Sequence, residues 1–274
     1  MFPGATDGPV SDARYAIVGA PLDVSGSFEP GARFGPGRIR RFAHAFEDYD
    51  HRTDQRFSDI AVVDRGDVRP WGDVPAYLDF LTGELGDVVE AGAFPLLLGG
   101  EHTVTVAGVR AAEPAVYVTL DAHLDLRERY DGYAMSHATV THHVRDRIED
   151  VIILGARAGS EEEWHRAGED AAVTAIEPDE TASWIEEELT DAVDGRDVYL
   201  SVDIDAFDPA YAPATGTKEP MGLTPEIART VIQTVAPGLV AADVVEVTDR
   251  DHGQTATLAA KLVRHLIYTH ASEQ

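Results

Sequence analysis

Three side chains of the kinds that bind metal ions stand at alternate positions in the segment VYVTLDAHLD, residues 116–125. Four of its first five residues are apolar or aromatic, as in a buried strand, and Asp121, His123 and Asp125 follow them. Alternate side chains of an extended backbone lie on the same face. The D-x-H-x-D spacing therefore predicts a strand that ends in three converging metal ligands.

Further candidate ligands follow other apolar runs of the chain. His102 ends the segment FPLLLGGEH, Asp203 and Asp205 end VYLSVDID, and Glu246 follows the run DVV. A single aspartate at the end of a strand is usually a turn former or a helix cap. Histidines and acids at the ends of several parallel strands instead meet at one edge of a sheet, where active sites collect. The pattern therefore predicts one shared site.

The chemistry of this site is predicted from its ligand set. His102, the D-x-H-x-D triplet and the D-x-D pair offer two imidazoles and four carboxylates, too many for one ordinary catalytic ion. Without cations, the carboxylates would repel one another and raise each other's pKa. Two divalent cations about 3.5–4 Å apart, bridged by a shared carboxylate, remove this conflict and acidify a bridging water toward hydroxide. Oxygen-rich ligation without thiolates favours Mn²⁺, with iron and cobalt as alternatives.

Apolar runs alternate with stretches of helical periodicity along the chain. We expect strands near residues 14–19, 60–64, 95–98, 116–120, 151–155, 172–176, 198–202 and 240–247. We expect helices at residues 73–92, 136–148, 179–193, 224–235 and 254–271. Continuous apolar strands that alternate with helices are typical of a parallel sheet covered on both faces. Residues 1–274 then form a single domain, either a doubly wound sheet or a closed barrel.

The composition excludes several classes of protein. The chain has 274 residues, 44% of them hydrophobic, which suffices for one large α/β domain. It has no cysteine, which excludes disulfides, thiolate catalysis and zinc–thiolate sites. The N-terminal segment lacks the apolar region of a signal peptide, and no apolar run approaches the ~20 residues that span a bilayer. We expect a soluble, cytoplasmic protein with no membrane partner.

The chain is strongly acidic, with 49 acidic and 22 basic residues and a formal net charge of −27. Nucleic-acid binding is disfavoured because it requires clustered lysine and arginine. The acidity could steer a cationic substrate, or it could form a solvating surface suited to high salt, where screening removes the self-repulsion. Because the acids are scattered along the whole chain, we favour a halophilic adaptation.

Two other features have a structural and a functional interpretation. His137 follows Ser136 at the start of an expected helix, and helix capping is a sufficient reason for that serine. His137 itself is either structural or reaches the site as a proton carrier. The segment GARFGPGRIR, residues 31–40, lacks the lysine of a phosphate-binding loop, so a turn that leads into a helix explains it better.

Together, these segments resemble the arginase/agmatinase (ureohydrolase) family, and most of all its archaeal-type agmatinases. The resemblance runs through GAPLDVSGSFEPGARFGPGRIR, GGEHT, DAHLD, SHAT, SVDIDAFDPAYAPATGT and DVVEV, and so covers most of the chain. It implies a three-layer α/β/α fold with an eight-stranded parallel sheet, which selects the open sheet over the barrel. It also implies a homo-oligomer, either a trimer or a hexamer.

The resemblance further implies two Mn²⁺ ions per chain and hydrolysis of a guanidino group to urea and an amine. By match to the family's motifs, one ion takes His102, Asp121, Asp125 and Asp203. The other ion takes His123, Asp121, Asp203 and Asp205, so that two aspartates bridge. Glu246 would hold the guanidinium, and Asp125 would orient the nucleophile and pass a proton to the leaving amine. His137 would carry protons to solvent.

The resemblance implies agmatine as the substrate, which would yield putrescine for polyamine biosynthesis. Where arginases have an acid that reads the substrate α-amine, this chain has Ser160. Glu128, Asp131 and the run 161–163 are candidates for the distal ammonium. Departures from the family pattern in SHAT, MGLT and EVTDRD leave arginine, guanidinobutyrate or a larger agmatine-bearing molecule as alternatives. A non-catalytic relative is a further alternative, although all six metal ligands are present.

Overall fold

The computed structural model describes residues 1–273. Within them, eight parallel strands form one sheet in the order β4-β1-β5-β10-β9-β6-β7-β8. The strands are β1 (Tyr15–Ala20), β4 (Val62–Asp67), β5 (Phe94–Gly99), β6 (Val116–Leu120), β7 (Asp150–Leu154), β8 (Val173–Ile176), β9 (Val198–Asp203) and β10 (Leu239–Val245). A short antiparallel ribbon, β2 (Tyr49–Asp50) with β3 (Gln55–Arg56), stands apart from this sheet. All eight expected strands are confirmed to within a few residues.

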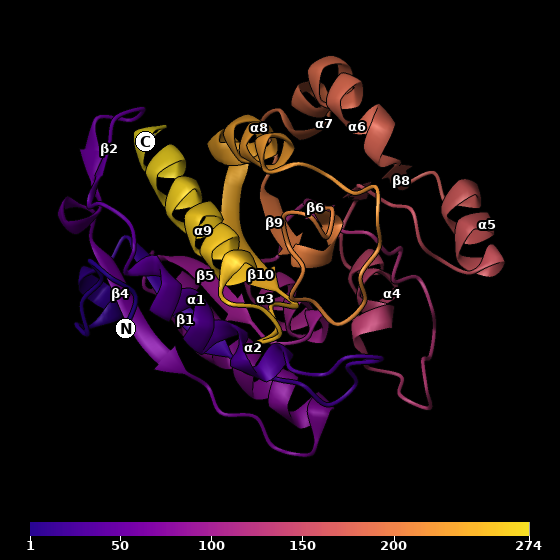
Figure 1. The fold of residues 1–274 in the computed structure, drawn as a ribbon, viewed down its shortest axis with the longest axis horizontal. Coiled ribbons are helices and arrows are strands. Elements are labelled where there is room, and N and C mark those ends of the chain that lie inside the picture. The colour runs from indigo at the N-terminus through magenta and orange to yellow at the C-terminus, as the bar shows by residue number, and fades with distance from the viewer. Residues whose placement is uncertain (274) are drawn as a thin grey trace.

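Helices cover both faces of the sheet (Figure 1). They are α1 (Gly35–Ala43), α2 (Val74–Glu90), α3 (Thr105–Ala112), α4 (Val140–Arg145), α5 (Glu161–Glu169), α6 (Pro178–Trp184), α7 (Thr190–Val193), α8 (Pro225–Val235) and α9 (Gln254–Ser272). A single π-helical turn, Ile185–Leu189, joins α6 to α7. Among residues 1–273, none of the helices combines the length and the apolar character needed to cross a membrane.

Most residues of the central strands are apolar and buried because each face of the sheet packs against helices. In β1, Tyr15 and Ile17 belong to the buried cluster that includes side chains of α1, α8 and α9. The alternate residues Ala16 and Val18 belong to a second cluster with α2. A third cluster places α3 and α4 against β6 and β7. The fold is therefore a three-layer α/β/α sandwich whose sheet is open, with β4 and β8 as its edges.

The helices differ from the expected ones in the length of one helix and in the presence of two further helices. The helix expected at 136–148 is shorter, because Thr139 leaves helical geometry (φ −130°, ψ 11°) and its hydroxyl accepts a hydrogen bond from Ser136 N–H. A 3₁₀ turn (His137–Thr139) therefore precedes α4, which ends at Arg145. Helices α3 and α5 were not expected. At the start of α5, Ser160 and Glu163 form the capping box that is typical of a helix start.

The strand order explains why distant segments can form one site. The four adjacent strands β5, β10, β9 and β6 occupy the middle of the sheet. Because they are parallel, the residues that follow each of them lie at the same edge. His102 follows β5, Asp121 follows β6, Asp203 ends β9, and Glu246 follows β10.

Candidate metal centre

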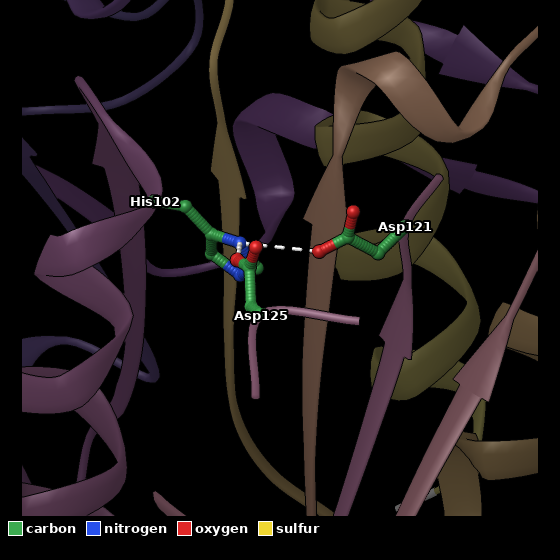
Figure 2. A group of neighbouring side chains, drawn as sticks. All are labelled: His102, Asp121 and Asp125. Atoms are coloured by element: carbon green, nitrogen blue, oxygen red, sulfur yellow. Dashed lines mark hydrogen bonds and ion pairs between the residues drawn. The ribbon is translucent and has the colours of Figure 1, made fainter. Parts of the chain in front are cut away.

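His102 is the centre of a first group of candidate ligands. It lies at the start of the 3₁₀ turn that follows β5, and its side chain is buried. Its Nδ1 atom is 3.0 Å from Asp125 Oδ2 and 3.2 Å from Asp121 Oδ2. Figure 2 shows both carboxylates directed at the imidazole. Asp203 Oδ2, from the end of β9, lies 3.6 Å from the same nitrogen.

His123 is the centre of a second group. Its Nδ1 atom is 3.0 Å from Asp205 Oδ2 and 3.7 Å from Asp121 Oδ1. The two oxygens of Asp121 therefore face different histidines, Oδ2 toward His102 and Oδ1 toward His123. Ligand atoms of His102, Asp121 and Asp125 lie within 4.8 Å of one another, as do those of Asp121, His123 and Asp205. The six residues expected from the sequence thus converge, with Asp121 between the two groups.

Two acids of this region adopt backbone conformations that are rare for residues with a side chain. Asp125 has φ 51° and Glu246 has φ 62°. Left-handed geometry in such residues costs of order 1–3 kcal/mol and persists where the surroundings hold it. The carbonyl of Asp125 accepts a hydrogen bond from His142 N–H, and the N–H of Glu246 donates to the Gly100 carbonyl. These bonds direct both carboxylates into the site.

Several carboxylates of the cluster are poorly compensated by protein charges. Burial and the carboxylate of Asp121 raise the pKa of Asp125 to about 7. Burial and the carboxylates of Asp205 and Asp121 raise the pKa of Asp203 well above its ordinary value. Burial, with smaller contributions from Glu101 and Asp205, raises the pKa of Glu246 to about 8. Their ionised forms therefore require additional positive charge nearby.

Within the cluster, His123 and Asp205 form a pair whose opposite charges stabilise each other. Burial alone would lower the pKa of His123, but the carboxylates of Asp205, Asp121 and Asp125 together outweigh this effect and raise it to about 10. In return, His123 overcomes the effect of burial and lowers the pKa of Asp205 to about 2. A proton on His123 therefore occupies a position where a divalent cation could bind. Imidazole nitrogens and carboxylate oxygens are a fitting donor set for two such cations.

A pocket of about 500 Å³ opens onto this cluster. His123 and Asp125 lie in its wall together with His137. Burial lowers the pKa of His137 to about 4, and its Nε2 atom has no hydrogen-bond partner among residues 1–273. The imidazole is therefore neutral near pH 7, and its unpaired Nε2 atom can form a hydrogen bond.

Glu246 lies beside His102 at the carboxyl end of β10. Its Oε1 atom accepts a hydrogen bond from the backbone N–H of His102 at 2.8 Å. The side chain is buried, with 7% of its surface exposed. The carboxylate is thus held next to the ligand cluster, where a cationic group could bind it.

Ser160 also lines the pocket, but its hydroxyl takes part in the cap of α5. Ser160 Oγ donates to Glu163 Oε2 at 2.8 Å and accepts from Glu163 N–H at 3.3 Å. Of the acids expected to meet a distal ammonium, Glu163 lies in the wall of this pocket, while Glu128 and Asp131 are not among its lining residues.

The sequence reasoning missed several residues that organise the site. The buried Glu101 accepts hydrogen bonds from the N–H and the hydroxyl of Ser25, at 2.7 Å each. Thr217 Oγ1 donates to Asp205 Oδ2 at 3.2 Å. Glu101 immediately precedes His102, which is the one sequence signal that could have suggested its place. Ser25 and Thr217 are distant in the chain from their partners and give no such signal.

Comparisons with known proteins agree with this geometry. The sequence model of the arginase family matches residues 13–268. Agmatinase of Bacillus anthracis is 36% identical over 272 residues, a match that covers 93% of this chain and 91% of that protein. N(1)-aminopropylagmatine ureohydrolase of Thermococcus kodakarensis is 35% identical over 261 residues, covering 93% and 90%.

A solved structure is similarly close. Agmatine ureohydrolase of Thermoplasma volcanium superposes with a TM-score of 0.91 at 33% identity, over 99% of this chain and 94% of that one. The family match, the similar sequences and the shared fold each extend over nearly the whole length. The protein therefore belongs to the arginase family.

Proposed function

We propose that the protein hydrolyses agmatine to putrescine and urea with two Mn²⁺ ions per chain. Membership of the arginase family makes it a ureohydrolase, an enzyme that hydrolyses guanidino groups. The observation that carries the proposal is the convergence of two imidazoles and four carboxylates at one site, two of whose residues line a pocket. The similarity to agmatinase over nine-tenths of the chain supports the choice of substrate.

The metal ligands are assigned in two sets. We assign one ion to His102, Asp121, Asp125 and Asp203. We assign the other to His123, Asp121, Asp203 and Asp205, with Asp121 and Asp203 shared. When bound, the ions would supply Lewis acidity that lowers the pKa of a water molecule toward neutrality. Such activation is needed because resonance makes the guanidinium carbon a poor electrophile.

The chain's own residues position the substrate and move protons. Glu246 accepts hydrogen bonds from the guanidinium, and such charge-assisted bonds are strong in a buried site. Asp125 orients the nucleophile and carries a proton to the leaving amine, which must depart neutral. His137, neutral in the pocket, exchanges protons between the site and solvent. Ser160 contributes to the pocket wall near the aliphatic part of the substrate.

A second candidate is a larger agmatine-bearing molecule. The Thermococcus kodakarensis relative is named for N(1)-aminopropylagmatine and is 35% identical, close to the 36% of the Bacillus anthracis agmatinase. Sequence identity therefore favours the smaller substrate only slightly. The same centre would cleave either molecule, because the guanidino group is common to both.

The experiment is a urea-release panel with purified, Mn²⁺-loaded protein in molar KCl. The substrates are agmatine, N(1)-aminopropylagmatine, arginine and 4-guanidinobutyrate. We expect kcat/KM to be highest for agmatine and arginine to be hydrolysed poorly. Urea from arginine but not from agmatine would contradict the proposal and indicate an arginase. Metal analysis of the same sample should give two manganese ions per chain.

We further propose that residues 1–274 act as one domain in a cytoplasmic homo-oligomer. The match of the family model to residues 13–268 supports the single domain. The trimer or hexamer rests on the family resemblance, and light scattering after size exclusion would measure it. Cell fractionation would test the location.

A further inference from the structure

Agmatine carries a positive charge at each end, and the metal centre accounts for only one of them. The guanidinium binds at the ligand cluster, while the primary ammonium lies four methylene groups away. An ammonium that leaves bulk water requires a carboxylate or a carbonyl acceptor to offset its desolvation. The wall of the pocket must therefore supply such an acceptor at some distance from the metal ligands.

The pocket wall contains three acids: Asp125, Glu163 and Glu219. Asp125 faces His102 and belongs to the ligand cluster. Glu163 is occupied by internal donors. Its Oε2 forms an ion pair with Arg127 Nε at 3.0 Å and accepts hydrogen bonds from the N–H and hydroxyl of Ser160 at 2.8 Å each. Its Oε1 accepts a hydrogen bond from Leu126 N–H at 3.2 Å. Glu163 therefore closes a helix cap and has little capacity left for a ligand.

Glu219 differs because its carboxylate is not engaged. The side chain is half-buried, and among residues 1–273 its oxygens have no hydrogen bond or ion pair. The adjacent Lys218 does not neutralise it. The ammonium of Lys218 instead pairs with Glu29 and donates to the Thr215 carbonyl at 3.2 Å. A negative charge without a bonded partner thus lies in the wall of a pocket that takes a cationic substrate.

Arg157 is the other cation near Glu219, and it acts on the backbone rather than on the carboxylate. The charge of Glu219 raises the pKa of Arg157, which burial lowers overall. The guanidinium donates to the main-chain carbonyls of Asp205 at 2.9 Å, Glu219 at 2.6 Å and Pro220 at 3.2 Å. One half-buried side chain therefore ties the segment of Glu219 to the segment of a metal ligand.

Glu219 is joined to the metal centre by a short stretch of chain. Thr217 donates a hydrogen bond from its hydroxyl to the ligand Asp205, and Glu219 is two residues further on. Two residues of chain span at most about 7 Å. Six covalent bonds separate the guanidinium carbon of agmatine from its ammonium nitrogen, so the acceptor for that ammonium must also lie near the metal centre.

We propose that the Glu219 carboxylate binds the distal ammonium of the substrate and thereby selects cationic guanidines, an inference that rests on the proposed agmatinase function. We assign the binding of the distal ammonium to Glu219 rather than to Glu128 or Asp131, the acids considered from the sequence, because those two residues do not line the pocket. Arg157 is the positioning residue that holds the Glu219 segment in place. The ligand of this subsite is a primary alkylammonium group.

The test compares agmatine with n-butylguanidine, which has the same carbon chain and no ammonium. Glu219→Gln keeps the size of the side chain and removes its charge. We expect kcat/KM for agmatine to fall by about 10- to 100-fold, the range of a hydrogen bond to a charged group. The value for n-butylguanidine should change less than twofold. Glu219→Asp should retain part of the preference for agmatine.

The matched control is Glu187→Gln, the same change at an exposed residue of the π-helical turn. This variant should have the wild-type kcat/KM for both substrates. The melting temperature of each variant verifies that it is folded. Glu219→Gln could leave the ratio of kcat/KM for agmatine to kcat/KM for n-butylguanidine unchanged, for example by lowering both values equally. The subsite assignment would then be wrong, while the agmatinase function would stand. If the metal-loaded wild type releases no urea from agmatine, the proposed function fails and the subsite fails with it.

Discussion

The hydroxyl oxygen of Ser25 accepts a hydrogen bond from the backbone N–H of His137 at 2.9 Å, although the two residues are 112 positions apart. Ser25 in turn donates to Glu101, whose carboxylate also accepts the N–H groups of Val24 and Ser25. One buried carboxylate thus joins the loop after β1 to the segment that carries the proposed proton carrier. His137 owes its position in the pocket to this contact between distant parts of the chain.

Ser25→Ala should lower kcat by about tenfold with little change in KM. The variant leaves the His137 N–H without its acceptor, and an unsatisfied buried group costs about 1–3 kcal/mol. Without this hydrogen bond, His137 is held less firmly and transfers protons less efficiently, which lowers kcat. Because His137 does not bind the substrate, KM should change little. Steady-state kinetics on agmatine would measure the effect, and Ser25→Thr, which keeps the hydroxyl, should restore most of kcat. An unchanged kcat in the alanine variant would show that His137 does not depend on this contact.

Asp121→Ala and Asp203→Ala should each abolish urea release and bound metal together. Both aspartates are assigned to both ions, so each variant removes a shared ligand. Metal analysis after dialysis should find no retained ion, against two per chain for the wild type. Asp191→Ala, an exposed residue of α7, is the control and should keep both ions. An active variant with two ions would refute the bridging assignment.

The buried ion pair of Arg40 and Asp64 should make stability dependent on pH in the acid range. Arg40 Nε and Nη2 each donate to an Asp64 oxygen at 2.8 Å. Burial opposes ionisation, but the Arg40 guanidinium outweighs it and lowers the pKa of Asp64. A depressed carboxyl pKa stabilises the fold above the unfolded value of about 3.9, and this contribution is lost as the pH falls through the folded pKa.

Asp64→Asn tests this dependence. The variant leaves Arg40 buried with a weaker partner, and breaking a buried pair costs about 3 kcal/mol. Urea unfolding of metal-free protein should therefore give a large loss of stability at pH 7 that shrinks toward pH 3. A loss that is constant between these pH values would contradict the assignment of the ion pair.

The net charge of −27 should make the protein depend on salt for stability. Repulsion among surface acids opposes the compact state, and ions screen it over a Debye length of about 3 Å at 1 M. We expect the melting temperature to rise steadily from dilute buffer to molar KCl. Equal melting temperatures across this range would argue against a halophilic adaptation.

Local sequence determined the strands and most of the candidate ligands. The apolar run 116–120 predicts β6 because a strand covered on both faces has no polar side. The D-x-H-x-D spacing predicts converging side chains because alternate residues of an extended backbone share a face. Both rules act over a few residues, so they can be read from the sequence. The capping box of α5 is equally local, and Ser160 and Glu163 could have revealed it.

The partners of these local elements were decided only by the tertiary structure. The order of the parallel strands brings the ends of β5, β6, β9 and β10 together, and nothing in any one strand specifies its neighbour. The hydrogen bonds between Ser25 and His137 and between Arg157 and Glu219 likewise join distant segments of the chain, so neither segment alone specifies its partner. Hydrogen bonding and burial depend on what surrounds a side chain. For this reason, the carboxylate of Glu163 has hydrogen-bond and ion-pair partners while that of Glu219 has none among residues 1–273, although both residues lie in the same pocket wall.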